Sequence, residues 1–178
     1  MDERDAVELI ETAVGHGKSW ADIGAGSGTF TRALRSLLPL NSRIYAVDHD
    51  PSAILALREI GNGVIPIQAD FTKPFALPDT AALDGILLAN ALHFVRDPGK
   101  VLGCLVTLLR PGGRVVVVEY DRRAASPWVP YPIASEHWPS IAATAGLTTP
   151  VITARTPSKY QGELYVGVAT WVVPAARF

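Results

Sequence analysis

Short apolar runs alternate with helical patterns along the first two thirds of this 178-residue chain. The runs read as strands buried on both faces, and they are KSWADI, RIYAVD, VIPIQ, LDGILLA and RVVVVEY. Segments with apolar residues at helical spacing, such as GTFTRALRSLL, lie between them. After residue 120 a proline- and aromatic-rich segment precedes a helix expected over 135–145 and two strands near 149–156 and 163–173, whose connection PSKYQG is typical of an antiparallel hairpin. The pattern predicts an α/β fold with a parallel sheet covered by helices on both faces.

Length and composition are those of one folded domain. With 178 residues, of which 48% are hydrophobic and 19% charged, the chain can bury a sizeable core, and no repeat or linker divides it. We therefore expect a single domain over residues 1–178. Within it we expect a short covering helix in residues 2–15, a core over 18–120, an insertion and helix over 121–147, and a terminal hairpin over 148–178.

Charge, cysteine content and hydropathy argue against several classes of protein. A formal net charge of -1 offers no broad basic surface, so we expect no nucleic-acid partner. The single cysteine, Cys104, is expected to be buried in a helix, and the four histidines lack the paired helical spacing of a metal site, so no metal is expected. We expect no secretory signal at the N-terminus, and no apolar run has the length of a membrane span. We expect a cytoplasmic monomer or homodimer with no membrane contact.

The first predicted strand runs into a glycine-rich loop, DIGAGSG, at residues 22–28. Gly24, Gly26 and Gly28 allow a tight turn and a close approach of the backbone to a ligand, and the N–H groups of the following helix point into that space. The fingerprint of dinucleotide-binding proteins would need a glycine where Thr29 stands. Taken alone, the loop is also compatible with a strand–helix turn that binds nothing.

Aspartates follow three successive strands. Asp22 stands just before the glycine turn, Asp48 ends RIYAVD, and Asp70 follows VIPIQ. The carboxyl ends of neighbouring parallel strands form one crevice, so these side chains are expected to line one site. Asp48 can accept hydrogen bonds from both hydroxyls of a ribose, Asp70 from the exocyclic amine of adenine, and Asp22 can face an ammonium group directly or through water. Each aspartate can instead be a helix cap or a turn former.

The segments WADIGAGSGTFTRAL, RIYAVDHDPSAI, PIQADF and LRPGGRVVVVEY resemble the successive motifs of the class I S-adenosylmethionine-dependent methyltransferases, over roughly residues 18–120. The resemblance implies a doubly wound, mostly parallel seven-stranded sheet with an antiparallel C-terminal hairpin. It also implies S-adenosylmethionine as the cofactor, bound by the core over 18–120, and a small molecule as the methyl acceptor. The cofactor-binding residues that it implies are Asp22, Gly24, Ala25, Gly26, Gly28, Asp48, His49, Asp70, Phe71, Asn90 and Ala91.

The segment ANALHF ends the fourth strand, and the resemblance places it below the reactive sulfonium. The methyl acceptor is therefore expected next to this segment. His93 is the candidate catalytic residue, because it can act as a general base near neutral pH, but it can also simply pack the turn. Tyr120, Trp128 and Tyr131 are candidates for binding an apolar or planar acceptor, unless they only pack the insertion. Residues 2–15 are expected either to cover the acceptor pocket or to leave it open.

Two other functions compete with methyl transfer. An NAD(P)-dependent oxidoreductase shares the sheet, the glycine turn and the ribose-binding acid, but the glycine spacing, the segment ADF and the terminal hairpin count against it. A non-catalytic module that binds S-adenosylmethionine stays open, because binding and catalysis are separable in this fold.

Overall fold

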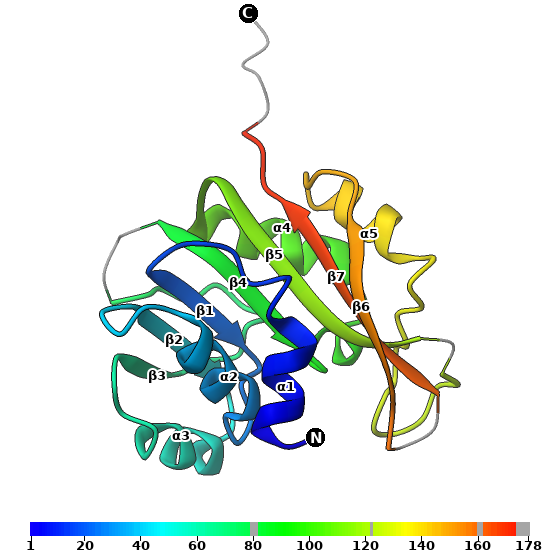
Figure 1. Cartoon of the computed structure of the whole chain (residues 1–178). Helices are drawn as coiled ribbons and strands as arrows, with labels where there is room; N and C mark the ends of the chain where they lie inside the picture. The colour runs from blue at the N-terminus through cyan, green and yellow to red at the C-terminus, as the bar shows by residue number, and fades with distance from the viewer. Residues whose placement is uncertain (79–81, 122, 160–161, 174–178) are drawn as a thin grey trace, which may run out of the picture.

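The computed structural model describes residues 1–78, 82–121, 123–159 and 162–173, which build one twisted sheet with helices on either side (Figure 1). The strands are β1 Ser19–Ile23, β2 Arg43–Asp48, β3 Val64–Gln68, β4 Leu83–Ala89, β5 Leu109–Asp121, β6 Val151–Pro157 and β7 Glu163–Thr170. The α-helices are α1 Glu3–Ile10, α2 Thr29–Leu37, α3 Pro51–Arg58, α4 Pro98–Leu105 and α5 Trp138–Thr144. Short 3₁₀ helices occupy Leu92–Phe94 and Val106–Leu108.

The sheet is seven-stranded, in the order β3-β2-β1-β4-β5-β7-β6. The first five strands pair in parallel, whereas β7 lies antiparallel to both β5 and β6. The predicted fold class is therefore confirmed, including the antiparallel terminal hairpin. All five parallel strands end at one edge of the sheet, which places the glycine loop and the segments after β2, β3 and β4 together.

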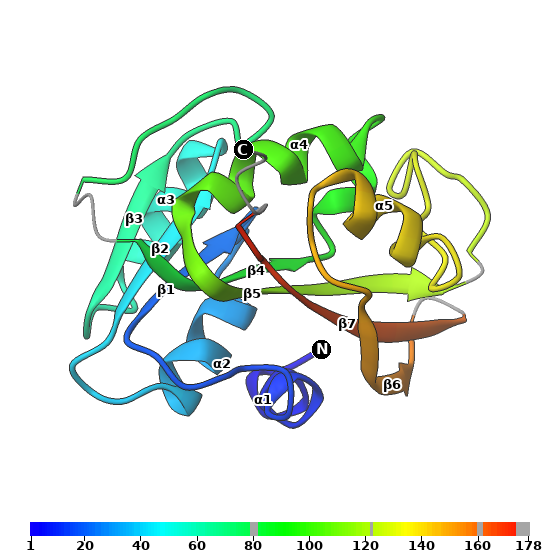
Figure 2. The same ribbon diagram turned by 90° about the horizontal axis from the view of Figure 1, so that it is seen from above.

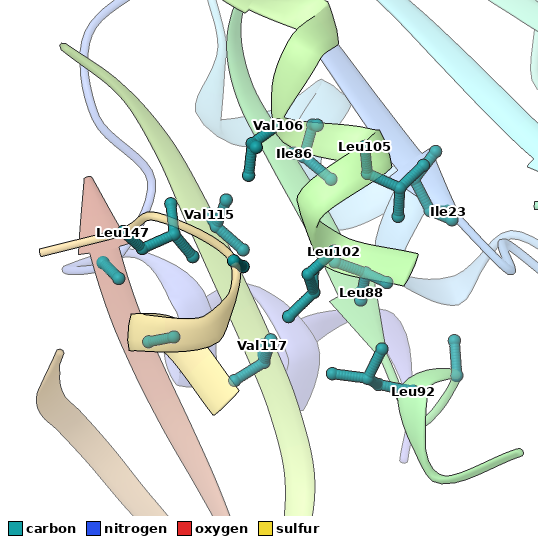
Figure 3. Close-up of a cluster of buried hydrophobic side chains, with 14 of the residues drawn as sticks. Ile23, Ile86, Leu88, Leu92, Leu102, Leu105, Val106, Val115, Val117 and Leu147 are labelled. Atoms are coloured by element: carbon teal, nitrogen blue, oxygen red, sulfur yellow. The ribbon is translucent and has the colours of Figure 1, made fainter. Parts of the chain in front are cut away.

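Helices cover both faces of the sheet, as Figure 2 shows for α1 and α2 on one side and α4 and α5 on the other. Under α4, a cluster of buried hydrophobic side chains joins the strands to the helices; it includes Ile23, Ile86, Leu102 and Val115 (Figure 3). Val116 belongs instead to the cluster under α1 and α2. Side chains of a strand alternate between its faces, so strands covered on both faces are mostly apolar along their length.

Local signals explain where three helices begin. Asp2 caps α1, and its carboxylate accepts a hydrogen bond from the Asp5 backbone N–H, with the reciprocal contact completing a capping box. Asp50 and Asp97 cap α3 and α4, each followed by a proline that suits the first helical turn.

Two expectations about helices need correction. Cys104 is exposed, because α4 turns Leu102 and Leu105 toward the sheet and leaves the cysteine on its outer side. The helix expected over 135–145 is shorter and begins at Trp138, next to Pro139, which suits a first turn.

None of the helices in the described part of the chain is both long and apolar enough to cross a bilayer. No group of three or more histidine, cysteine or acidic side chains among the described residues is placed to hold a metal ion.

Candidate active site

The glycine loop connects β1 to α2 and packs against two neighbours. The backbone N–H groups of Gly24 and Ala25 donate to the Val47 carbonyl, at 2.8 and 3.0 Å. A Cβ atom added to Gly24 would lie 2.6 Å from the Cβ of Ala91, so this glycine is required by packing. A Cβ added to Gly26 would meet nothing within 4 Å. Gly26 is therefore the position where the loop backbone faces open space and a ligand can approach it.

Asp48 binds the loop to the end of β2. One carboxylate oxygen accepts the Gly26 N–H at 2.8 Å and the other accepts the Asp50 N–H at 2.9 Å. Two ionised oxygens can accept about four hydrogen bonds, so each retains capacity for a ligand hydroxyl. The carboxylate is nearly buried, and the His49 ring next to it is exposed, with Nδ1 3.5 Å from Oδ1 of Asp48. This arrangement suits the predicted ribose contact.

The loop stands between two hollows that share Gly26 and Ser27 in their walls. One, of about 600 Å³, is lined by Asp48, His49 and the start of α3. The other hollow, of about 620 Å³, is called the cleft below. It runs from the loop past Asn90 and Tyr120 to α1 and β6. Together they offer an elongated site with the loop at its middle.

Asp22 lies beneath the loop rather than in either wall, and its side chain is buried. Its carboxylate accepts a hydrogen bond from the Thr31 hydroxyl at 2.6 Å. Burial raises the pKa of Asp22 to about 7, with a smaller contribution from the Asp48 charge, while the Thr31 hydrogen bond opposes the shift. Contact of Asp22 with a cofactor ammonium stays a prediction.

Replacing Asp22 by asparagine is expected to make the protein relatively more stable as the pH rises. The folded-state pKa lies above the unfolded one, so stability present at low pH is lost as the pH rises toward 7. The free energy of unfolding of Asp22→Asn relative to the unmutated protein should therefore rise by about 2 kcal/mol between pH 5 and 7. Urea unfolding at both pH values measures it. A difference that does not vary with pH would show that Asp22 titrates normally.

Asp70 and Phe71 follow β3, and their side chains have different neighbours. The Asp70 carboxylate accepts hydrogen bonds from the backbone and hydroxyl of Thr72 and lies 2.9 Å from Lys73 Nζ. These hydrogen bonds lower the pKa of Asp70 to about 2, and the largest contribution comes from Thr72. Phe71 lies against Gly24, since its Cε1 would be 3.6 Å from a Cβ there. Neither residue lines either hollow, and their adenine contact stays a prediction.

The end of β4 brings Asn90 and Ala91 to the glycine loop. Asn90 lines the cleft, and its backbone N–H donates to the Val118 carbonyl at 2.8 Å. Its φ of 53° is in the left-handed region, which asparagine adopts more readily than most residues. Ala91 is buried against Gly24.

His93 is buried and bound to a residue that the sequence analysis did not single out. Its Nδ1 lies 2.6 Å from the carboxylate of Glu119, whose other oxygen accepts the backbone N–H groups of Leu92 and His93. Glu119 is fully buried and follows Val117 on the α4 side of the sheet. His93 is not among the described residues that line the cleft, so its role as a base stays a prediction.

Only one of the three aromatic residues predicted on the acceptor side lines the cleft. Tyr120 does so, and the guanidinium carbon of Arg123 lies 4.3 Å from its ring centroid. Trp128 and Tyr131 are exposed and absent from the described cleft walls. The proline-rich segment instead packs beside the helical turn of His93, where the Tyr131 N–H donates to the His93 carbonyl at 3.0 Å.

The far wall of the cleft comes from α1 and from the edge strand β6. Helix α1 contributes Asp5, Glu8 and Leu9, and residues 154–159, which span the end of β6 and the turn after it, complete the wall. Lys159 Nζ is 4.0 Å from the Asp5 carboxylate across this wall. The amphipathic pattern predicted α1, but nothing in the sequence indicated that β6 would face it.

A family model described as a methyltransferase domain matches residues 21–117, more than half of the chain. The chain belongs to this family. The class I S-adenosylmethionine-dependent methyltransferase expected from the motifs is therefore confirmed. The match spans the glycine loop and the ends of β2 and β4.

Curated methyltransferases match over part of their length. The ubiquinone/menaquinone biosynthesis C-methyltransferase UbiE of Pseudomonas paraeruginosa is 28% identical over 131 residues, which cover 70% of this chain and 49% of that protein. UbiE of Pasteurella multocida is 27% identical over 123 residues, covering 65% of this chain and 45% of that protein. The chain thus spans about half the length of these two relatives.

Solved methyltransferase structures share the fold across nearly the whole chain. The 1,6-didemethyltoxoflavin-N1-methyltransferase of Burkholderia thailandensis, solved with 1,6-didemethyltoxoflavin and S-adenosylhomocysteine, superposes with a TM-score of 0.75 at 23% identity, covering 96% of this chain and 78% of that one. A SAM-dependent methyltransferase from Aquifex aeolicus gives 0.73 at 18% identity, covering 96% and 90%.

Proposed function

We propose that this chain transfers the methyl group of S-adenosylmethionine to a small-molecule acceptor. The observation that carries the proposal is the elongated site divided by the glycine loop, with Asp48 on one side and the cleft past Asn90 on the other. One hollow suits an adenosine, and the cleft suits the methionyl end together with an acceptor. Its volume of about 620 Å³ is within the usual range for small-molecule sites.

The residues present fit this cofactor. Gly26 leaves open space at the loop backbone, and the Asp48 oxygens keep lone pairs for a ribose diol. His49 and Ser27 supply further walls. When bound, S-adenosylmethionine supplies a methyl group already activated by a positively charged sulfur. The protein then has to bind and orient the two reactants and exclude water, which can provide most of the acceleration.

Three further expectations belong to the proposal. We expect a cytoplasmic protein, a monomer or homodimer, and no nucleic-acid partner. The near-neutral composition supports the last of these. A small molecule as acceptor is supported by the fold shared with a methyltransferase solved with one.

Calorimetry tests cofactor choice. Titration should show binding of S-adenosylhomocysteine and no comparable binding of NADH, because Thr29 replaces the third glycine of a dinucleotide fingerprint. The reverse preference would support the oxidoreductase. Methyl transfer itself is tested by mass spectrometry of a broad acceptor panel incubated with S-adenosylmethionine, and binding without any methylated product would favour a non-catalytic module.

A further inference from the structure

Three aromatic side chains are exposed together on one part of the surface. They are Phe94, Trp128 and Tyr131, and we call them the aromatic patch. Their two segments lie side by side, because the Tyr131 N–H donates to the His93 carbonyl at 3.0 Å. The ring of Phe94 packs on the His93 ring, with 4.5 Å between centroids, and stays exposed on its outer side. Single exposed apolar residues are normal, whereas a group of them indicates an interaction site.

The loop that carries Trp128 is held in a fixed shape. Ser126 and Val129 exchange backbone hydrogen bonds at 3.1 and 3.0 Å, and the Val129 N–H also lies 3.2 Å from the Ser126 hydroxyl. Val129 and Ile133 of the same segment are buried. The loop thus packs some of its apolar side chains inside the protein and presents Trp128 and Tyr131 to the outside.

Basic side chains accompany the aromatic patch. Segments 93–100 and 123–137 carry three basic residues against two acidic ones, namely Arg96, Lys100 and Arg123 against Asp97 and Glu136. None of the three basic side chains forms an ion pair with a described carboxylate. These cations can therefore meet anionic groups of a partner.

The size and chemistry of the patch favour a membrane surface over a folded protein. An aromatic side chain buries about 150–250 Å² when fully covered, so at exposures of 54%, 79% and 43% the three offer about 350 Å². A stable protein interface needs about 800 Å² on each partner. Tryptophan and tyrosine are enriched at the depth of lipid headgroups, and arginine and lysine are attracted to anionic lipids.

We propose that the aromatic patch docks this protein on an anionic membrane surface, with Trp128 inserted among the lipid headgroups. Arg96, Lys100 and Arg123 would lie beside it, against the lipid phosphates. The sequence argument against membrane contact rested on the length of apolar runs, which bears on membrane spans and not on surface binding. The proposal concerns a surface outside the cleft and does not depend on the identity of the methyl acceptor.

Sedimentation with lipid vesicles tests the proposal. The full chain is mixed with vesicles of phosphatidylcholine that contain a quarter of phosphatidylglycerol, and the bound protein is pelleted, whereas protein alone should stay in the supernatant. Trp128→Ala should bind these vesicles about tenfold more weakly, because a large apolar side chain is lost from the contact. Vesicles of phosphatidylcholine alone should bind the unmutated protein about fivefold more weakly, because the basic residues lose their anionic partners.

Fluorescence quenching places Trp128 at the bilayer. Lipids brominated close to the headgroup should quench the unmutated protein and leave Trp128→Phe unquenched. The other tryptophans are shielded or distant: Trp20 and Trp138 are fully buried, and Trp171 is bonded to Gly113 at the opposite edge of the sheet. Quenching that persists in Trp128→Phe would contradict the proposed orientation.

Leu55→Ala is the matched control, because Leu55 is 61% exposed on α3, which packs on β2 and β3 in the other half of the sheet. It should change vesicle binding less than about twofold. The proposal is overturned if Trp128→Ala binds as tightly as the unmutated protein, if both vesicle types bind equally, or if neither retains the protein, which would leave the patch to a protein partner. Calorimetry with S-adenosylhomocysteine should give the same Kd for Trp128→Ala and the unmutated protein, so failure of the cofactor site is distinguishable from failure of docking.

Discussion

Replacing Glu119 by alanine is expected to lower the free energy of unfolding by about 3–5 kcal/mol. The carboxylate is fully buried, and it accepts from the backbone of Leu92 and His93 and contacts the His93 ring. Alanine leaves these groups buried without an acceptor, and each costs about 1–3 kcal/mol. Urea unfolding followed by circular dichroism should show a lower midpoint with an unchanged slope.

Two further variants make this test specific. Glu119→Gln keeps one carbonyl oxygen for the two backbone donors, so it should lose less stability than Glu119→Ala. Glu163→Ala removes a partly exposed carboxylate that pairs with Arg155, and should cost about 1 kcal/mol or less. If Glu119→Ala proves no more costly than Glu163→Ala, the buried carboxylate does not hold the turn after β4.

Replacing Asp48 by alanine is expected to weaken the binding of S-adenosylhomocysteine roughly a hundredfold, or about 3 kcal/mol. Two contacts to the ribose are lost, and the Gly26 N–H loses the oxygen that holds the loop at 2.8 Å. Calorimetry measures the affinity, and circular dichroism confirms that the variant is folded.

The control removes a carboxylate from another strand–helix connection. Asp97 caps α4 and lines neither hollow, so Asp97→Ala should cost about 1 kcal/mol of stability and leave the affinity unchanged. A folded Asp48→Ala variant that binds within about twofold of the unmutated protein would contradict the ribose assignment.

The order of elements could be predicted because each buried strand is marked in the sequence by a run of apolar residues. β1, β2, β4 and β5 are covered on both sides, so each contains a run of consecutive apolar residues, and Pro51 and Pro98 stand where helices begin. The exposure of Cys104 could not be read in this way. Its neighbours are apolar, and only the packing of α4 decides which of them face the sheet.

The sequence predicted that the glycine loop and Asp48 would lie together, but not which residues would line the cleft. The glycine loop and Asp48 are close in space because successive parallel strands end at one edge. His93, by contrast, is held by Glu119, which belongs to no motif and lies on the face of the sheet away from Tyr120. The wall that faces the loop joins α1 to β6, and no local pattern records a contact between two elements so far apart in the sequence.

The reversed strand β7 has a consequence for how such an enzyme can diversify. It pairs with β5 along its length and carries β6 at the outer edge of the sheet, so residues 154–159 reach the cleft without touching the strands that carry the loop and Asp48. Substitutions in the last strand pair can reshape this wall of the cleft and leave the parallel half intact. The architecture thus separates the part that must stay constant from the part free to acquire new substrates.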